Sequence, residues 1–161
     1  MDKKYTLALA RSASRSASNA RQILRALREA GLVPGHSGLP TSTHIARIVM
    51  ALAADLVKDV VPTVTVLRTL PISTPCGLPA TAEAMLTRLI DILPHGPVFG
   101  DYDVDDGFVH IADDSISLEC LTLAGHRACA RYGALFTGIA HTVTIPVSTI
   151  RAITVAIKDQ K

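Results

Sequence analysis

The chain has 161 residues, a length that fits one domain or a small N-terminal module followed by a second compact one. Hydrophobic residues make up 48% and the mean hydropathy is +0.34, so the chain can bury a core and is not disordered throughout. Aromatic residues make up only 4%, with no Trp, which argues against proteins that stack single-stranded bases on aromatic side chains.

The net charge of +2 conceals a strong asymmetry along the chain. Residues 1–47 carry eight basic residues against two acidic ones, a net charge of +6. Residues 81–120 carry nine acidic residues against one basic residue, a net charge of −8. A basic N-terminal third joined to an acidic centre is typical of a protein whose basic segment binds nucleic acid and whose acidic segment offsets that charge. A basic surface that is merely solvated gives the same pattern.

No segment has the pattern of a membrane anchor or a secretion signal. The apolar stretch "ARIVMALAADLV" is interrupted by Arg47 and Asp55, and no apolar run or cleavage site follows the initial "MDKK". The three cysteines are an odd number without framework spacing, which is typical of reduced thiols. We therefore expect a cytoplasmic protein that does not contact membranes.

The first third of the chain predicts two short helices. Residues 3–13 can form the first helix, and the serines of "SRSAS" at 14–18 favour a turn. A second helix is expected to follow, with Ser18 as a candidate N-cap and an apolar stripe that includes Ile23 and Leu27. Gly31 and Pro34 are expected to end it.

The elements expected in the rest of the chain include helices, a connector and strands. A Gly- and Pro-rich loop at 33–40 precedes a helix over 42–57, capped by Thr41 or Ser42. The following "VVPTVTVLRTLPISTPCGLP" is interpreted as the end of that helix, a short strand and a connector, and residues 80–93 predict another helix. Alternating and β-branched residues within 108–123 and 133–146 predict a small antiparallel sheet. The tail over 147–160 fits either a strand or a short packing helix.

Inward positions of this predicted sheet follow from its alternation. They are Val109, Ile111, Ile116 and Leu118.

Metal and catalytic patterns are weak. "DYDVDDG" at 101–107 spaces its aspartates like a calcium loop, but it has Asp106 where the loop needs Gly and Ala112 where it needs Glu. An acidic turn entering a strand is the favoured interpretation. Cys120, His126 and Cys129 lack the paired spacing of a zinc site, and no nucleophile elbow or phosphate loop is present. We therefore expect no metal, no cofactor and no enzymatic activity.

The N-terminal pattern of a short helix, a serine-rich turn and an arginine-bearing helix is that of a helix-turn-helix unit. Asn19, Arg21, Gln22 and Arg25 lie early in the second helix, where side chains reach base edges in the major groove. Arg28 shares the face of Arg21 and Arg25. The residues expected to hold phosphates are Arg11, Arg15, Ser14, Ser16 and Ser18.

The stretch "ILRALREAGLVP" at 23–34 resembles the end of the recognition helix in MerR-like winged helix-turn-helix proteins. Leu24–Arg25 and Gly31-Leu32-Val33-Pro34 match that pattern. The resemblance, which also extends to small phage DNA-binding proteins, covers about the first third of the chain. It implies a groove helix at 17–28 and a wing, "GHSGLPTST", that touches the DNA backbone through His36 and Thr41. The wing's usual Arg–Tyr pair and the long dimerisation helix are missing from this chain.

Together these patterns predict an α+β protein. A helical module over 1–94, with a winged helix-turn-helix in 3–57, is followed by a small antiparallel β-rich domain over 97–161. The predicted function is sequence-preferring binding of double-stranded DNA, as a transcriptional regulator of phage or mobile-element type. One recognition helix buries little surface, so a homodimer or higher homo-oligomer is expected, with the sheet as the contact.

Two other functions compete with DNA binding. The first is a protein–protein module, such as a phage inhibitor or packaging component, whose acidic centre docks a basic partner. The second is a small hydrolase or metal enzyme.

Overall fold

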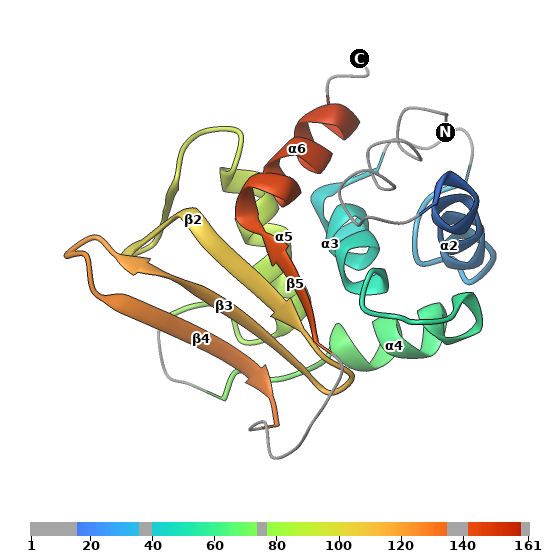
Figure 1. Cartoon of the computed structure of the whole chain (residues 1–161), viewed down its shortest axis with the longest axis horizontal. Coiled ribbons are helices and arrows are strands. Elements are labelled where there is room, and N and C mark those ends of the chain that lie inside the picture. The colour runs from blue at the N-terminus through green and yellow to red at the C-terminus, as the bar shows by residue number, and fades with distance from the viewer. Residues whose placement is uncertain (1–15, 36–39, 74–76, 135–141, 159–161) are drawn as a thin grey trace.

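Helices and an antiparallel sheet lie side by side in the computed structural model, which describes residues 16–35, 40–73, 77–134 and 142–158 (Figure 1). The helices are α2 (Ala17–Glu29), α3 (Ser42–Ala51), α4 (Val60–Leu67), α5 (Ala82–Ile92) and α6 (Val147–Lys158), with a 3₁₀ turn at Val57–Asp59. The strands are β1 (Val98–Phe99), β2 (Tyr102–Ile111), β3 (Ser115–Thr122), β4 (Arg127–Gly133) and β5 (Val143–Pro146). The predicted mixed fold with an antiparallel sheet is confirmed.

Within the described residues the sheet has five antiparallel strands. β2 pairs with β3 and β3 with β4, while β1 and β5 pair with the two ends of the other edge of β2. The predicted inward positions Val109, Ile111, Ile116 and Leu118 are all buried. β4 was not predicted, and its sequence "RACARYG" puts Ala130 and Tyr132 inward and arginines outward.

The acidic stretch at 101–107 differs from its prediction. Most of it belongs to β2, which begins at Tyr102, and is not a turn before the strand. A bulge interrupts the pairing with β3 between Asp103 and Phe108, and Gly107 passes so close to β3 that a Cβ would lie 3.0 Å from the Glu119 carbonyl oxygen.

The helix predicted over 42–57 is shorter than expected. α3 ends at Ala51, where tight turn bonds follow, such as that from the Ala53 amide to the Met50 carbonyl. Leu56, the last residue of the predicted apolar stripe, is 54% exposed. The prediction was wrong because an apolar pattern does not reveal where a chain turns between two helices.

The stretch after that turn is a separate helix, α4, and not a helix end with a strand. Val60, Val64 and Leu67 recur at helical spacing and are buried. Pro62 is the third residue of α4, so it lies in the first turn, where a backbone amide has no helical partner. β-branched residues therefore form a helix here because their buried face outweighs their lower helix propensity.

One hydrophobic cluster joins the helices and the sheet. It includes Leu27 of α2, Val49 of α3, Leu86 of α5, Leu118 of β3 and Ile153 of α6. The tail, for which strand and helix remained open, is the helix α6, which contacts β2, α3 and α5. In Figure 1, α5 and α6 lie on one side of the sheet, and none of the described helices covers its other face.

Candidate functional site

The helix α2 is built as the sequence predicts, one residue longer than expected at its C-terminal end. Its N-cap is Ser16 and not Ser18, because the Ser16 hydroxyl accepts the Asn19 amide at 3.1 Å. Ile23, Leu24 and Leu27 face the core. Gly31 ends the helix with a φ of +68°, a conformation that favours glycine.

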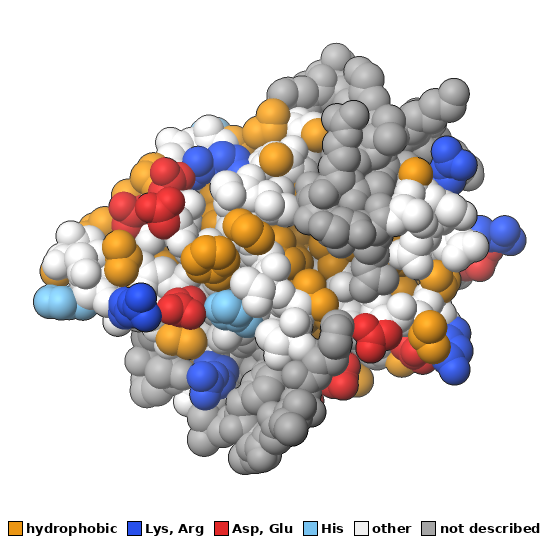
Figure 2. All heavy atoms as spheres, viewed as in Figure 1, with side chains coloured by type: hydrophobic (Ala, Val, Ile, Leu, Met, Phe, Trp, Pro, Cys, Tyr) orange, Lys and Arg blue, Asp and Glu red, His pale blue; other side chains and the backbone are white. Residues whose placement is uncertain are grey.

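The opposite face of α2 is polar and basic. Arg21, Gln22 and Arg25 are exposed, and the first turn contains no acidic residue. The Arg25 Nε donates to Glu29 Oε1 at 2.7 Å, and this hydrogen bond and charge raise the pKa of Arg25 above its usual value. In Figure 2, Lys and Arg side chains project along the edge of the molecule at which Figure 1 places α2.

The structure brings six of the ten predicted DNA-binding residues onto this single helix: Ser18, Asn19, Arg21, Gln22, Arg25 and Arg28. Arg28 is half-buried, and its Nε has no hydrogen-bond partner among the described residues. Three others, Arg11, Arg15 and His36, lie outside the described residues, as do the predicted first helix and the tip of the predicted wing.

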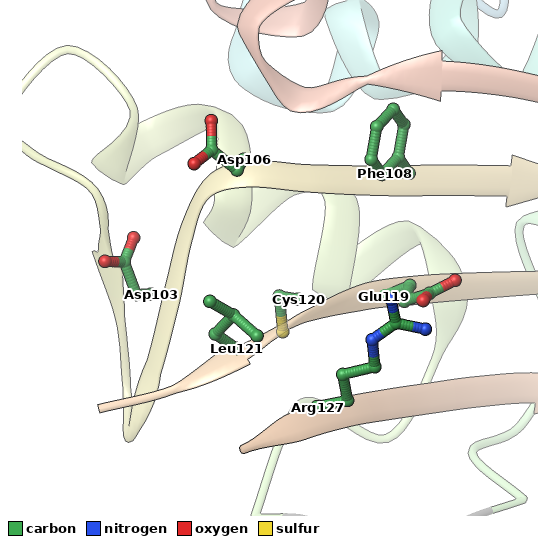
Figure 3. A pocket seen from close by; sticks show the side chains of 7 residues that line it. All are labelled: Asp103, Asp106, Phe108, Glu119, Cys120, Leu121 and Arg127. Atoms are coloured by element: carbon green, nitrogen blue, oxygen red, sulfur yellow. The ribbon is translucent and has the colours of Figure 1, made fainter. Parts of the chain in front are cut away.

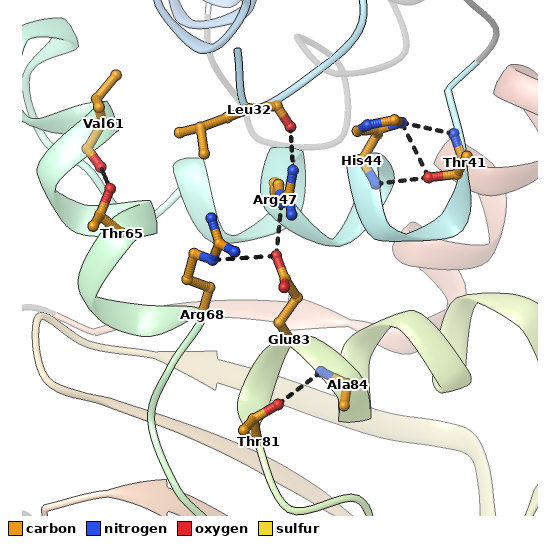
Figure 4. Close-up of polar contacts among 10 residues, drawn as sticks. All are labelled: Leu32, Thr41, His44, Arg47, Val61, Thr65, Arg68, Thr81, Glu83 and Ala84. Atoms are coloured by element: carbon orange, nitrogen blue, oxygen red, sulfur yellow. Dashed lines mark hydrogen bonds and ion pairs between the residues drawn. The ribbon is translucent and has the colours of Figure 1, made fainter. Parts of the chain in front are cut away.

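The tenth residue, Thr41, has a structural role. Its hydroxyl accepts the His44 amide, while the Thr41 amide donates to His44 Nδ1 at 3.0 Å (Figure 4). This reciprocal pair caps α3, which confirms Thr41 as one of the two predicted caps. Residues 42 and 43 of the predicted wing are the first turn of α3.

The uncovered face of the sheet presents a second set of polar side chains. Strand register aligns Thr144 of β5, His110 of β2, Ser117 of β3 and Arg131 of β4 in one row across the sheet. The neighbouring row contains Phe108, Glu119 and Cys129 in the same strand order, β2 to β4. Figure 2 shows hydrophobic, acidic, basic and histidine side chains intermixed over this part of the molecule.

His110 links the two rows. Its Nδ1 lies 2.9 Å from Thr144 Oγ1, and its Nε2 lies 3.3 Å from Glu119 Oε2. Both ring nitrogens of His110 therefore have a partner, which fixes the orientation of the ring on the sheet.

Two hollows lie on the same face. One, of about 210 Å³, is lined by Phe108, Leu121 and the mixed charges of Asp103, Asp106, Glu119 and Arg127 (Figure 3). The other, of about 200 Å³, lies beside the polar row and includes His110, Ser117 and Arg131. Arg131 was not among the predicted site residues because β4 was not predicted, although the alternation of Arg127, Cys129 and Arg131 was a signal for an exposed strand face.

Within the described ranges, no three His, Cys, Asp or Glu side chains are grouped so that they could hold a metal ion. Among the same residues, no helix is long and apolar enough to cross a membrane. Comparison with known protein families, curated proteins and solved structures finds no match for this chain.

Proposed function

We propose that the chain binds double-stranded DNA through the exposed face of α2, as a regulator of phage or mobile-element type that acts in the cytoplasm without catalysis. The observation that carries this proposal is that α2 is amphipathic. Its apolar stripe is buried, while Arg21, Gln22 and Arg25 are presented to solvent. A helix of 13 residues is about 20 Å long, and a helix fits into the major groove.

The chemistry of these side chains suits the reading of base edges. Arg can donate two hydrogen bonds to guanine, and Gln can pair with adenine. The Arg25–Glu29 pair is no obstacle, because its side chains are 79% and 64% exposed and exposed pairs contribute at most about 1 kcal/mol. In the finer form of the proposal, α2 is the recognition helix of a winged helix-turn-helix unit.

Gel-shift titrations of the full chain on duplex fragments test the proposal. We expect log affinity to fall with log salt by about 0.9 per phosphate neutralised. Arg21→Ala and Arg25→Ala should each cost about 1–3 kcal/mol at a cognate base pair and relax the sequence preference. Glu29→Gln, which releases Arg25, should strengthen binding.

Arg88→Ala is the matched control, because it removes an equal charge from the exposed surface of α5. It should leave the affinity almost unchanged. Salt-independent binding, or equal losses from Arg88→Ala and Arg21→Ala, would refute the role of α2.

We further propose that the DNA-binding form is a homodimer, because one recognition helix buries too little surface for tight specific binding. Phe108 and Leu121 on the uncovered sheet face are each 41% exposed, which supports this part of the sheet as the contact. Sizing chromatography of the full chain, beside the gel-shift, tests whether its mass is twice that of one chain.

The alternative function, docking of a basic protein partner, is favoured by exposed aspartates in and around β2 and β3, namely Asp101, Asp105, Asp106, Asp113 and Asp114. A chain that fails to shift duplex DNA at low salt would favour this function over DNA binding.

A further inference from the structure

The smaller hollow lies where β2 ends and β3 begins. It is lined by His110, Ala112, Ser115, Ser117, Arg131 and Thr142. Ala112 and Ser115 are short and buried at its base, whereas the longer His110 and Arg131 come from the adjacent row. This difference in side-chain length leaves a volume of about 200 Å³, less than the roughly 300 Å³ at which drug-sized pockets begin.

The charge of this hollow is positive. Among the described residues that line it, Arg131 alone has a permanent charge and none is Asp or Glu. Arg131 makes no ion pair with a described residue, unlike Arg25, Arg47 and Arg151, each of which pairs with a carboxylate. The guanidinium therefore keeps its donors available at the pocket.

Ser115 provides a second hydrogen-bonding group at the hollow. Its side chain lines the hollow, the residue is only 6% exposed, and its hydroxyl has no hydrogen-bond partner among the described residues. Unlike the Arg28 and Arg151 Nε atoms, this hydroxyl is not cut off from solvent, so it is open to the hollow and can donate a hydrogen bond to a ligand there.

We propose that this pocket binds the phosphate group of a small phosphate-bearing molecule. The Arg131 guanidinium provides paired N–H donors for two phosphate oxygens, and the Ser115 and Ser117 hydroxyls provide donors to the others. Three carboxylates lie near the pocket in sequence or space. Glu119 Oε2 contacts His110 Nε2 at 3.3 Å, and Asp113 and Asp114 are exposed in the β2–β3 turn. None of these carboxylates lines the pocket.

The site does not depend on the proposed DNA contact. Figure 1 places α2 at one end of the molecule and strands β2, β3 and β4 at the other. Along β3, Ser117 and Leu121 are four residues apart, or about 13 Å, but Phe108 of the proposed dimer contact stacks on His110 of the pocket with ring centroids 6.3 Å apart, so the two sites adjoin on one face.

Thermal shift and calorimetric titration of the full chain with inorganic phosphate, against chloride at equal ionic strength, test the proposal. Phosphate should raise the melting temperature saturably, because a ligand that binds only the folded state stabilises it. Arg131→Ala should weaken phosphate binding at least about tenfold. Arg127→Ala, an equal loss of charge on the same strand and face, should leave phosphate binding unchanged.

Ser115→Ala separates binding from folding. It should leave the melting temperature in chloride almost unchanged, since the hydroxyl makes no hydrogen bond with a described residue, yet reduce phosphate affinity several-fold. The proposal is overturned if phosphate gives no saturable shift, or if Arg131→Ala and Arg127→Ala reduce it equally. Displacement of phosphate by duplex DNA would also overturn it, because the pocket would then belong to the nucleic-acid contact.

Discussion

At the scale of single residues, His44 combines a capping role with a titratable ring. Its Nδ1 accepts the Thr41 amide at the start of α3, which only a neutral imidazole can do. Burial lowers the pKa of His44 below its ordinary value of 6.5, and the Arg47 guanidinium lowers it further, while Glu83 partly opposes them. The folded state therefore disfavours protonation of this ring.

The direction of the pH dependence follows from this lowered pKa. The unfolded chain binds the proton more readily, so the contribution of His44 to stability is complete above pH 6.5. It is lost as the pH falls below 6.5 toward the folded-state pKa. Urea unfolding at a series of pH values should show this loss.

His44→Gln is the control for that experiment. Gln at the third helical position can still accept the Thr41 amide but does not titrate. The variant should keep stability near neutral pH and lose the part of the pH dependence that the wild type shows just below pH 6.5. An unchanged pH profile in His44→Gln would assign the dependence to other groups.

At the scale of elements, Glu83 joins three helices and a loop. The Arg47 Nε of α3 donates to Glu83 Oε1 of α5 at 2.6 Å (Figure 4). The Nε of Arg68, the C-cap residue of α4, lies 3.7 Å from the same oxygen. Arg47 also donates to the Leu32 carbonyl after α2 at 2.9 Å. The side chains of Arg47 and Glu83 are 15% and 18% exposed, so this cluster is largely shielded from water.

Glu83→Gln should destabilise the fold by on the order of 3 kcal/mol, because it leaves two arginines without their shared carboxylate in a shielded site. Glu29→Gln makes the same chemical change at an exposed pair and should cost less than about 0.5 kcal/mol. Urea denaturation of both variants checks the difference. Equal, small effects would mean that water reaches the cluster and screens it.

The extent to which the sequence predicted these elements depends on where their signals lie. α2 and α5 were predicted because each has its own caps and apolar stripe. α4 and the end of α3 were not, because the turn between them is set by packing against the rest of the core. β4 was missed because its alternation is short and partly alanine, and a small residue is a weak signal for an inward position.

The candidate sites show the same limit. A basic helix face is a local pattern, so Arg21 and Arg25 could be found from their spacing. The pocket beside Arg131 depends on strand register, which brings together side chains from β2, β3 and β4. Register is set by tertiary pairing, so the sequence alone does not show which residues of these strands lie side by side.

At the scale of the whole molecule, the helical and β-rich parts share one core. The connector between α4 and α5 runs along β4, where the Gly133 amide donates to the Pro71 carbonyl at 2.9 Å and the Ser73 amide to the Arg131 carbonyl at 2.8 Å. The Tyr132 hydroxyl donates to the Pro79 carbonyl at 2.9 Å. The boundary predicted near residues 94–97 separates the described helical segments up to α5 from the strands, but α6 returns to contact α3 and α5.

We therefore expect the chain to unfold in a single cooperative transition. The chain has three tyrosines and no Trp, and in a Tyr5→Phe variant only Tyr102 and Tyr132, both in the sheet, remain to fluoresce. The far-UV circular dichroism signal reports mainly the helices. Because one hydrophobic cluster contains residues of both parts, urea should change the two signals with the same midpoint and slope. If the tyrosine signal changed while the helical signal persisted, the two parts would be separate domains that fold independently, as the sequence patterns predicted.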